Sequence, residues 1–126
     1  FDFLERLMDS DCLYQNDIII IDSLSSLIQH SAGSNGCLLL LGFLKKMASQ
    51  GKTIILTIGE DDTQVAPLRL ASDVYLALKI KVSGDGVQRM VQVKRFIRAR
   101  GRVQDMILYR IEPMVGLVIE LTEVSG

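Results

Sequence analysis

An aspartate and a serine, Asp22 and Ser23, come directly after a run of four isoleucines at residues 18–21. Four β-branched apolar residues in succession are typical of a strand that is buried on both faces, as in the middle of a parallel sheet. A carboxylate at the end of such a strand is costly to bury unless a cation or a hydrogen-bond donor pairs with it. One chemistry that uses a carboxylate in this place is the coordination of Mg²⁺ bound to nucleotide phosphates.

This pattern is that of a Walker B aspartate in a P-loop ATPase. The alternative is that Asp22 only caps the short helix predicted over residues 23–30, because Asp is a favoured residue at helix amino ends. The residues alone leave both interpretations open, since a strand followed by Asp and Ser is common in α/β proteins.

The matching phosphate-binding loop, G-x-x-x-x-G-K-[ST], is not found in the 126 residues. Gly51-Lys52-Thr53 ends like that motif, but Lys46 stands where its first glycine belongs. The order of elements is also helix then strand, whereas the motif needs strand then helix. We interpret Gly51 as the residue that ends the preceding helix. We therefore expect the second half of a nucleotide-binding domain, and the first residue, Phe1, fits a fragment or a processed product.

Composition narrows the class of protein. A chain of 126 residues is expected to form one domain, and its 48% hydrophobic content fits a largely buried sheet or a face that another surface covers. The longest apolar runs, such as residues 37–41, are too short to span a bilayer, and no signal peptide opens the chain. Cys12 and Cys37 show neither metal-ligand nor disulfide spacing, which indicates a reducing compartment. We therefore expect a cytoplasmic protein with no segment inserted in the membrane.

Charge is divided unevenly between the two halves of the chain. Residues 1–63 carry 4 Lys or Arg against 9 Asp or Glu, which gives −5, and residues 64–126 carry 10 against 6, which gives +4. Two solvated faces that differ by chance would explain this difference. It also permits head-to-tail self-association, in which the acidic half of one copy meets the basic half of the next.

The predicted elements fall into two groups. Helical spacing over residues 1–9, 23–30 and 37–50 alternates with apolar strands at residues 17–22 and 53–58, and a short helix is predicted at residues 67–71. The second group holds paired strands at residues 73–82, 87–96, 106–112 and 117–123, joined by turn signals at residues 83–86 and 113–116. The fold class is therefore α/β, with parallel strands first and an antiparallel meander after them.

Several segments together resemble KaiC-like ATPases of the RecA superfamily, and more narrowly the accessory ATPases of the archaellum, the archaeal flagellum. They are residues 17–23, 51–57, 71–76, the sequence VKRF at residues 93–96, and residues 110–120, which begin RIEP and end VIE. The resemblance covers nearly the whole chain, and the order and spacing of the segments are more specific than any one of them. It implies that residues 1–126 form the carboxyl-terminal part of a RecA-like P-loop ATPase core, the half that holds Walker B.

The resemblance also implies a function. Such proteins bind ATP with Mg²⁺ and form rings, expected to be hexamers. They lie in the cytoplasm at the inner face of the membrane, beside the archaellum motor ATPase and the membrane platform protein. Asp22 matches the Walker B aspartate and metal ligand, Ser23 the hydroxyl beside it, and Thr57 the region of the γ-phosphate sensor. The P-loop and the catalytic glutamate would precede residue 1, so this chain alone is expected to be inactive and to bind ATP weakly.

A basic cluster begins at the end of the strand predicted at residues 87–96 and continues beyond it. Its members are Lys94, Arg95, Arg98, Arg100 and Arg102. In the ring-forming relatives, basic residues from this strand reach the γ-phosphate held by a neighbouring subunit, where they offset its charge. By resemblance Lys94 fits this role best, and Arg98 is a further candidate. The alternative is a solvated hairpin edge whose charges block unwanted strand pairing.

Two further classes of function remain open. A RecA-like half-domain could act as an interaction module that uses no nucleotide, and a recombinase-like ATPase could bind DNA. Binding of nucleic acid is not expected, because the chain has no Trp and 6% aromatic residues, which supplies few stacking platforms. The acidic triplet at residues 60–62 could hold a cation near the nucleotide site or simply be a solvated loop.

Overall fold

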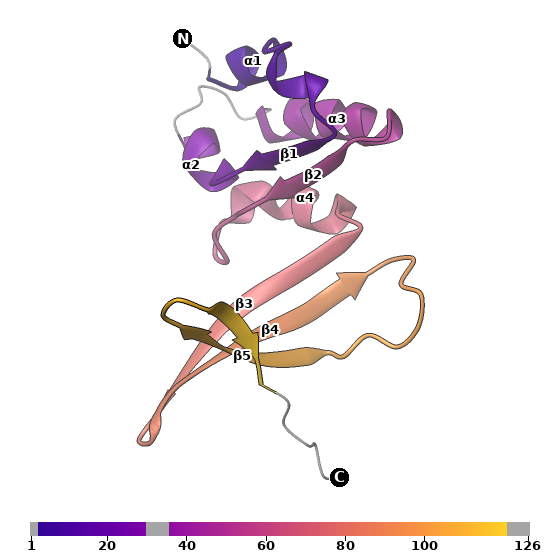
Figure 1. The fold of residues 1–126 in the computed structure, drawn as a ribbon. Helices are drawn as coiled ribbons and strands as arrows, with labels where there is room; N and C mark the ends of the chain where they lie inside the picture. The colour runs from indigo at the N-terminus through magenta and orange to yellow at the C-terminus, as the bar shows by residue number, and fades with distance from the viewer. Residues whose placement is uncertain (1–2, 30–35, 121–126) are drawn as a thin grey trace. The chain divides into compact units, whose positions relative to one another are not determined.

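The computed structural model describes residues 3–29 and 36–120, and the chain divides into two compact units, Phe1–Ala71 and Ser72–Gly126. Residue 30, the last of the helix predicted at residues 23–30, and residues 121–123 of the last predicted strand lie outside the described residues. The elements of the first unit are α1 (Phe3–Met8), η1 (Leu13–Gln15), β1 (Ile18–Ile21), α2 (Leu24–Gln29), α3 (Gly36–Ser49), β2 (Thr53–Leu56), η2 (Thr63–Val65) and α4 (Ala66–Ala71) (Figure 1).

Strands β1 and β2 form a two-stranded parallel sheet in which Ile18 lies opposite Thr53 and Ile21 opposite Leu56. The chain passes from one strand to the other through α2 and α3, as a crossover between parallel strands requires. The prediction of an α/β unit over this half of the sequence is confirmed. Strand β2 ends two residues earlier than the sequence predicts, at Leu56.

The core of the first unit lies on one face of this sheet. Ile19 and Ile21 are 6% and 7% exposed, whereas Ile18 and Ile20 are 60% and 65% exposed. The expectation of a strand buried on both faces is therefore wrong for β1, because the described residues pack against only one face. The buried side chains behind that face belong mainly to the helices, and the largest fully buried ones are Leu4, Leu24, Leu40 and Val65.

Helix α3 ends at Ser49, and two residues later Gly51 has a left-handed backbone with a φ of 87°. Replacing Gly51 with alanine is expected to lower the free energy of unfolding by about 1 kcal/mol, because a Cβ atom is strained in that conformation although the space around it is open. Gly42, in the middle of α3, is the matched control because a Cβ there also meets no atom within 4 Å. Gly42→Ala should raise the free energy of unfolding by about 0.5 kcal/mol through helix propensity. Urea unfolding that shifts both variants in the same direction would contradict this account.

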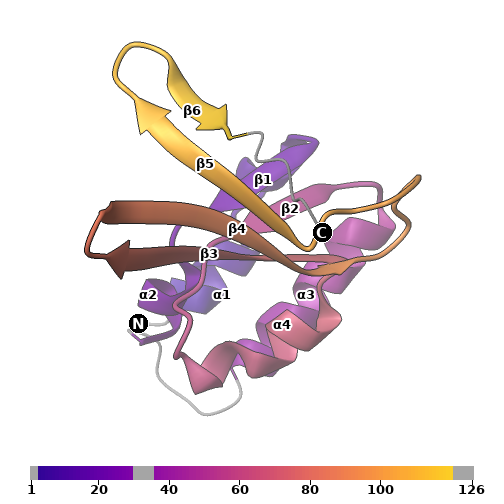
Figure 2. The ribbon, with the colours of Figure 1, turned by 90° about the horizontal axis from the view of Figure 1, so that it is seen from below.

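The second unit is a four-stranded antiparallel sheet in the order β3–β4–β5–β6 (Figure 2). Its strands are β3 (Val74–Ser83), β4 (Gly86–Phe96), β5 (Met106–Glu112) and β6 (Gly116–Ile119). The predicted meander is confirmed, and its tight turns fall at the predicted places. One face of the sheet carries exposed aliphatic side chains, such as Leu78 at 70% and Val82 at 76%, which accounts for part of the high hydrophobic content. In the part of the chain that the structure describes, no helix is long and apolar enough to cross a bilayer.

Candidate functional site

Asp22 and Thr57 meet at the carboxyl end of the parallel sheet. Asp22 directly follows β1 and Thr57 directly follows β2, and the hydroxyl of Thr57 donates a hydrogen bond to Oδ1 of Asp22 at 2.5 Å. The backbone holds this pair, because the N–H of Thr57 donates to the carbonyl of Ile21 at 3.1 Å. The two residues that the sequence placed at the ends of neighbouring strands are thus brought into direct contact.

The cap of helix α2 is Ser23, and not Asp22. The hydroxyl of Ser23 accepts the backbone N–H of Ser26 at 3.3 Å, which is the bond that an amino-terminal cap makes. The peptide bond between Asp22 and Ser23 is cis. Because capping is done by the hydroxyl, the carboxylate of Asp22 is left for another partner, and the capping interpretation of Asp22 loses its support.

The surroundings of Asp22 fit a Mg²⁺ ion that is held mainly by water and phosphate. The side chain is exposed, and among the described residues only Thr57 donates to its carboxylate. Mg²⁺ commonly takes one or two protein carboxylates and completes its shell with water and substrate phosphates. A dedicated cage is absent from the described residues, where no three Asp, Glu, His or Cys side chains converge. That finding gives no support to the acidic triplet at residues 60–62 as a separate cation site.

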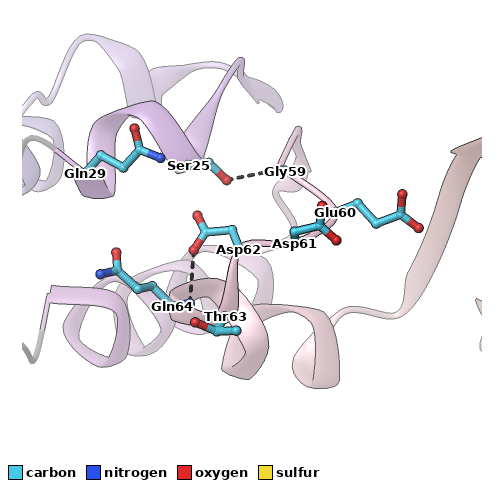
Figure 3. Close-up of a pocket in the computed structure, with 8 residues that line it drawn as sticks. All are labelled: Ser25, Gln29, Gly59, Glu60, Asp61, Asp62, Thr63 and Gln64. Carbon is cyan, nitrogen blue, oxygen red and sulfur yellow. Dashed lines mark hydrogen bonds between the residues drawn. The ribbon is translucent and has the colours of Figure 1, made fainter.

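A groove of about 530 Å³ lies beside this end of the sheet. Figure 3 shows that α2 forms one wall of the groove and that the segment after β2 forms the other. The lining residues are Ser25, Gln29, Gly59, Glu60, Asp61, Asp62, Thr63 and Gln64. Oδ1 of Asp62 accepts the backbone N–H of Gln64 at 3.0 Å, so part of the acidic triplet is used to hold the loop.

Gly51-Lys52-Thr53 lies at the opposite end of the sheet from Asp22. Lys52 forms a long ion pair with Asp17, with Nζ 3.9 Å from Oδ1, and the N–H of Thr53 donates to the carbonyl of Asp17. Both contacts join the amino ends of β1 and β2. The interpretation of this sequence as a helix end followed by a strand, and not a phosphate-binding loop, agrees with the structure.

Lys94 occupies an irregular position near the end of β4. Tyr75 pairs with Arg95 and Leu76 pairs with Val93, so Lys94 is the extra residue of a β-bulge. Bulges turn a side chain away from the regular alternation and are frequent next to functional sites. Lys94 is exposed and has no hydrogen-bond or ion-pair partner among the described residues.

The arginines near Lys94 differ from one another in what they do. The guanidinium of Arg95 donates to the carbonyl of Ser72 at 2.9 Å, which is a structural role within the second unit. Arg98 lies in the loop between β4 and β5 with a φ of 65°, an uncommon conformation for a residue other than glycine. Arg98, Arg100 and Arg102 are all exposed. Lys94 and Arg98 therefore belong to the second unit, while Asp22, Ser23 and Thr57 belong to the first.

Cys37 does not have the environment of a reactive thiol. Burial raises the pKa of the Cys37 thiol, and the negative charge of Asp62 raises it further. A raised pKa keeps the thiol protonated at neutral pH, which lowers its nucleophilicity. Cys12 is exposed and lies within 3.6 Å of the Ser10 hydroxyl. Both cysteines were expected to be small buried apolar residues; Cys37 agrees with this expectation, and Cys12, which is exposed, does not.

Two polar side chains near the site were not singled out by the sequence. Ser25 is 7% exposed, and its hydroxyl accepts the N–H of Gly59 at 2.8 Å. Arg69, on α4, donates to the carbonyls of Gly59 and Glu60. No sequence motif marks either residue. Ser25 and Gly59 are 34 residues apart in the chain, and Arg69 is 9 or 10 residues from the carbonyls that it contacts.

Two curated proteins are similar in sequence to nearly the whole of this chain. The chain is 30% identical over 127 residues to the archaeal flagellar ATP-binding protein FlaH of Methanococcus voltae, covering 98% of this chain and 55% of that protein. It is 26% identical over 126 residues to the FlaH of Methanocaldococcus jannaschii, covering 98% and 54%. No protein-family model matches the chain. The chain spans about half the length of the curated relatives that it matches.

Solved structures show the same fold. The crystal structure of flagellar accessory protein FlaH from Methanocaldococcus jannaschii matches with a TM-score of 0.82 and 24% identity, over 96% of this chain and 55% of that one. A KaiC-like protein from Pyrococcus horikoshii matches with a TM-score of 0.70 and 17% identity, over 94% and 53%. The predicted resemblance to KaiC-like ATPases and to the archaellum accessory ATPases is therefore confirmed, as is the RecA-like fold class.

Proposed function

We propose that this chain, which has the KaiC-like fold and is similar along nearly its whole length to archaeal flagellar ATP-binding proteins, takes part in binding MgATP in the archaellum. The observation that carries the proposal is the contact between Asp22 and Thr57 at the carboxyl end of the parallel sheet. In open α/β sheets, ligands bind outside the carboxyl ends of the strands. Asp22 would hold Mg²⁺, which supplies charge neutralisation to the phosphates, and Ser23 and Thr57 would place hydroxyl groups beside it.

The second part of the proposal is assembly into a ring, expected to be a hexamer. Lys94 would reach the nucleotide bound by the adjacent subunit, and Arg98 is the next candidate for that role. The exposed, bulged position of Lys94 supports this role, because the side chain is available to a second molecule. The division of charge into −5 and +4 permits head-to-tail contact. We further propose that the protein lies in the cytoplasm at the inner face of the membrane. Its partners there would be the archaellum motor ATPase and the membrane platform protein.

An interaction module that uses no nucleotide is the second candidate function. The exposed aliphatic face of the β3–β6 sheet favours it, since large exposed apolar faces mark surfaces that bind other proteins. The two candidates differ in whether Asp22 is needed for a response to Mg²⁺ and ATP.

Calorimetric titration of the chain with ATP separates these candidates. Because no phosphate-binding loop is present in the 126 residues, we expect a dissociation constant for MgATP of about 1 mM or weaker. Mg²⁺ should still strengthen the binding of ATP, and Asp22→Asn should abolish that effect of Mg²⁺. Asp17→Asn is the matched control, because Asp17 flanks the same strand at its amino end. Micromolar affinity of the unaltered chain would refute the expectation of weak binding, and an equal effect of Mg²⁺ on both variants would refute the role proposed for Asp22.

A further inference from the structure

The segment that follows β2 is fixed by side chains from two helices. Ser25 of α2 accepts the N–H of Gly59 at 2.8 Å, and Arg69 of α4 donates to the carbonyls of Gly59 and Glu60. The carbonyl of Gly59 also accepts the N–H of Asp62 at 3.3 Å. This segment begins two residues after Thr57, so its position determines how the chain leaves the candidate nucleotide site.

Ser25 completes a set of bonds that enclose Thr57. On one side the N–H of Thr57 donates to Ile21, and on the other its carbonyl accepts the N–H of Leu24 at 2.9 Å. The bond from Gly59 to Ser25 then fixes the chain beyond it. Ser25 is 7% exposed, so water competes little for this bond, and its loss would leave a part-buried N–H without an acceptor.

We propose that Ser25 is a positioning residue for the site formed by Asp22 and Thr57. It acts through Gly59, and it holds the end of β2 so that the Thr57 hydroxyl points toward Oδ1 of Asp22. Ser25 itself does not touch Asp22 or the bound nucleotide in this account. The inference rests on the proposed function, because it assigns Ser25 a part in the response to Mg²⁺ and ATP.

The same contacts connect the site to the groove. Ser25 and Gly59 are joined by a hydrogen bond, and both residues line the groove shown in Figure 3. If a ligand in the groove changes the affinity for ATP, ATP must change the affinity for that ligand by the same factor, because such coupling is reciprocal. Arg69 is the second anchor of this segment, because its planar fork reaches two adjacent carbonyls, which a lysine cannot do in the same way.

The test measures the affinity of the chain for ATP with Mg²⁺ and with EDTA, together with the amide signal of Gly59 in NMR spectra. Ser25→Ala should reduce the strengthening effect of Mg²⁺ by about fivefold, which is the scale of one lost hydrogen bond. Ser25→Thr, which keeps the hydroxyl, should restore most of it. In the unaltered chain, addition of MgATP should move the Gly59 signal, and in Ser25→Ala that movement should shrink.

One variant serves as a matched control. Ser49→Ala removes a hydroxyl of the same unit that donates to the carbonyl of Lys46, on α3. It should retain the full effect of Mg²⁺. Circular dichroism at the titration temperature establishes that every variant is folded.

The outcomes separate the two claims. If Mg²⁺ strengthens ATP binding in the unaltered chain and equally in Ser25→Ala and Arg69→Lys, the positioning role is refuted while the proposed function stands. A lower melting temperature of Ser25→Ala with an unchanged effect of Mg²⁺ has the same meaning, since it shows a role in stability alone. If Mg²⁺ has no effect in the unaltered chain, the proposed function fails, and the inference fails with it.

Discussion

Leu40→Ala is expected to lower the free energy of unfolding by about 3 kcal/mol, as the truncation of a fully buried leucine does. Leu40 lies on α3 and is 0% exposed, within the cluster that also contains Leu4, Leu24 and Val65. The loss combines the transfer of the deleted atoms to water with the cavity that they leave behind. Urea unfolding followed by far-ultraviolet circular dichroism measures it.

Leu39→Ala is the matched control, because Leu39 is the preceding residue on the same helix and is 64% exposed. It should change the free energy of unfolding by no more than about 0.5 kcal/mol. Equal losses for the two variants would show that α3 does not present the Leu40 face to the core.

In the intact ring-forming protein proposed above, Lys94→Ala and Asp22→Ala should each suppress the assembly that ATP induces, and mixing the two variants should restore part of it. If the lysine of one subunit reaches the nucleotide held by the next, an equal mixture returns both residues to about a quarter of the interfaces. The measurement is light scattering with and without MgATP. Neither variant should alter the free energy of unfolding by more than about 1 kcal/mol, since both side chains are exposed.

Lys81→Ala controls for the loss of a lysine from the same sheet, because Lys81 is exposed on β3 and has no partner among the described residues. It should assemble like the unaltered chain. If each single variant assembles with ATP as much as the unaltered protein does, Lys94 does not act across a subunit boundary. A mixture that assembles no more than the single variants would lead to the same conclusion.

The parallel strands were predictable because their apolar runs and the helical spacing between them are local features of the sequence, whereas the role of Thr57 was implied only by the family resemblance. The isoleucine run defines β1, the helical spacing after it requires a crossover, and a parallel return strand places Thr57 beside Asp22. The sequence did not decide which residue caps α2, because Ser and Asp are both favoured at helix amino ends. The hydrogen bond from the N–H of Ser26 to the Ser23 hydroxyl identifies Ser23 as the cap.

The prediction that both faces of β1 are buried was wrong, because a run of apolar residues does not show which face other elements pack against. Ile18 and Ile20 have the same side chain as Ile19 and Ile21, and the difference arises from where the helices pack. The bulge at Lys94 was also beyond the sequence, since register depends on the pairing of β3 with β4 and on no single residue. Ser25 escaped notice because Ser23, Ser25 and Ser26 are chemically alike and differ only in their distant partners.

The most direct test of the account is to locate the metal–nucleotide site with MnATP, whose paramagnetic ion broadens nearby amide signals in NMR spectra. The account predicts that the signals of Asp22, Ser23 and Thr57 broaden first, that those of Asp17 and Lys52 at the other end of the sheet remain sharp, and that Asp22→Asn removes the effect. Broadening centred on Glu60, Asp61 and Asp62 that persists in Asp22→Asn would contradict it.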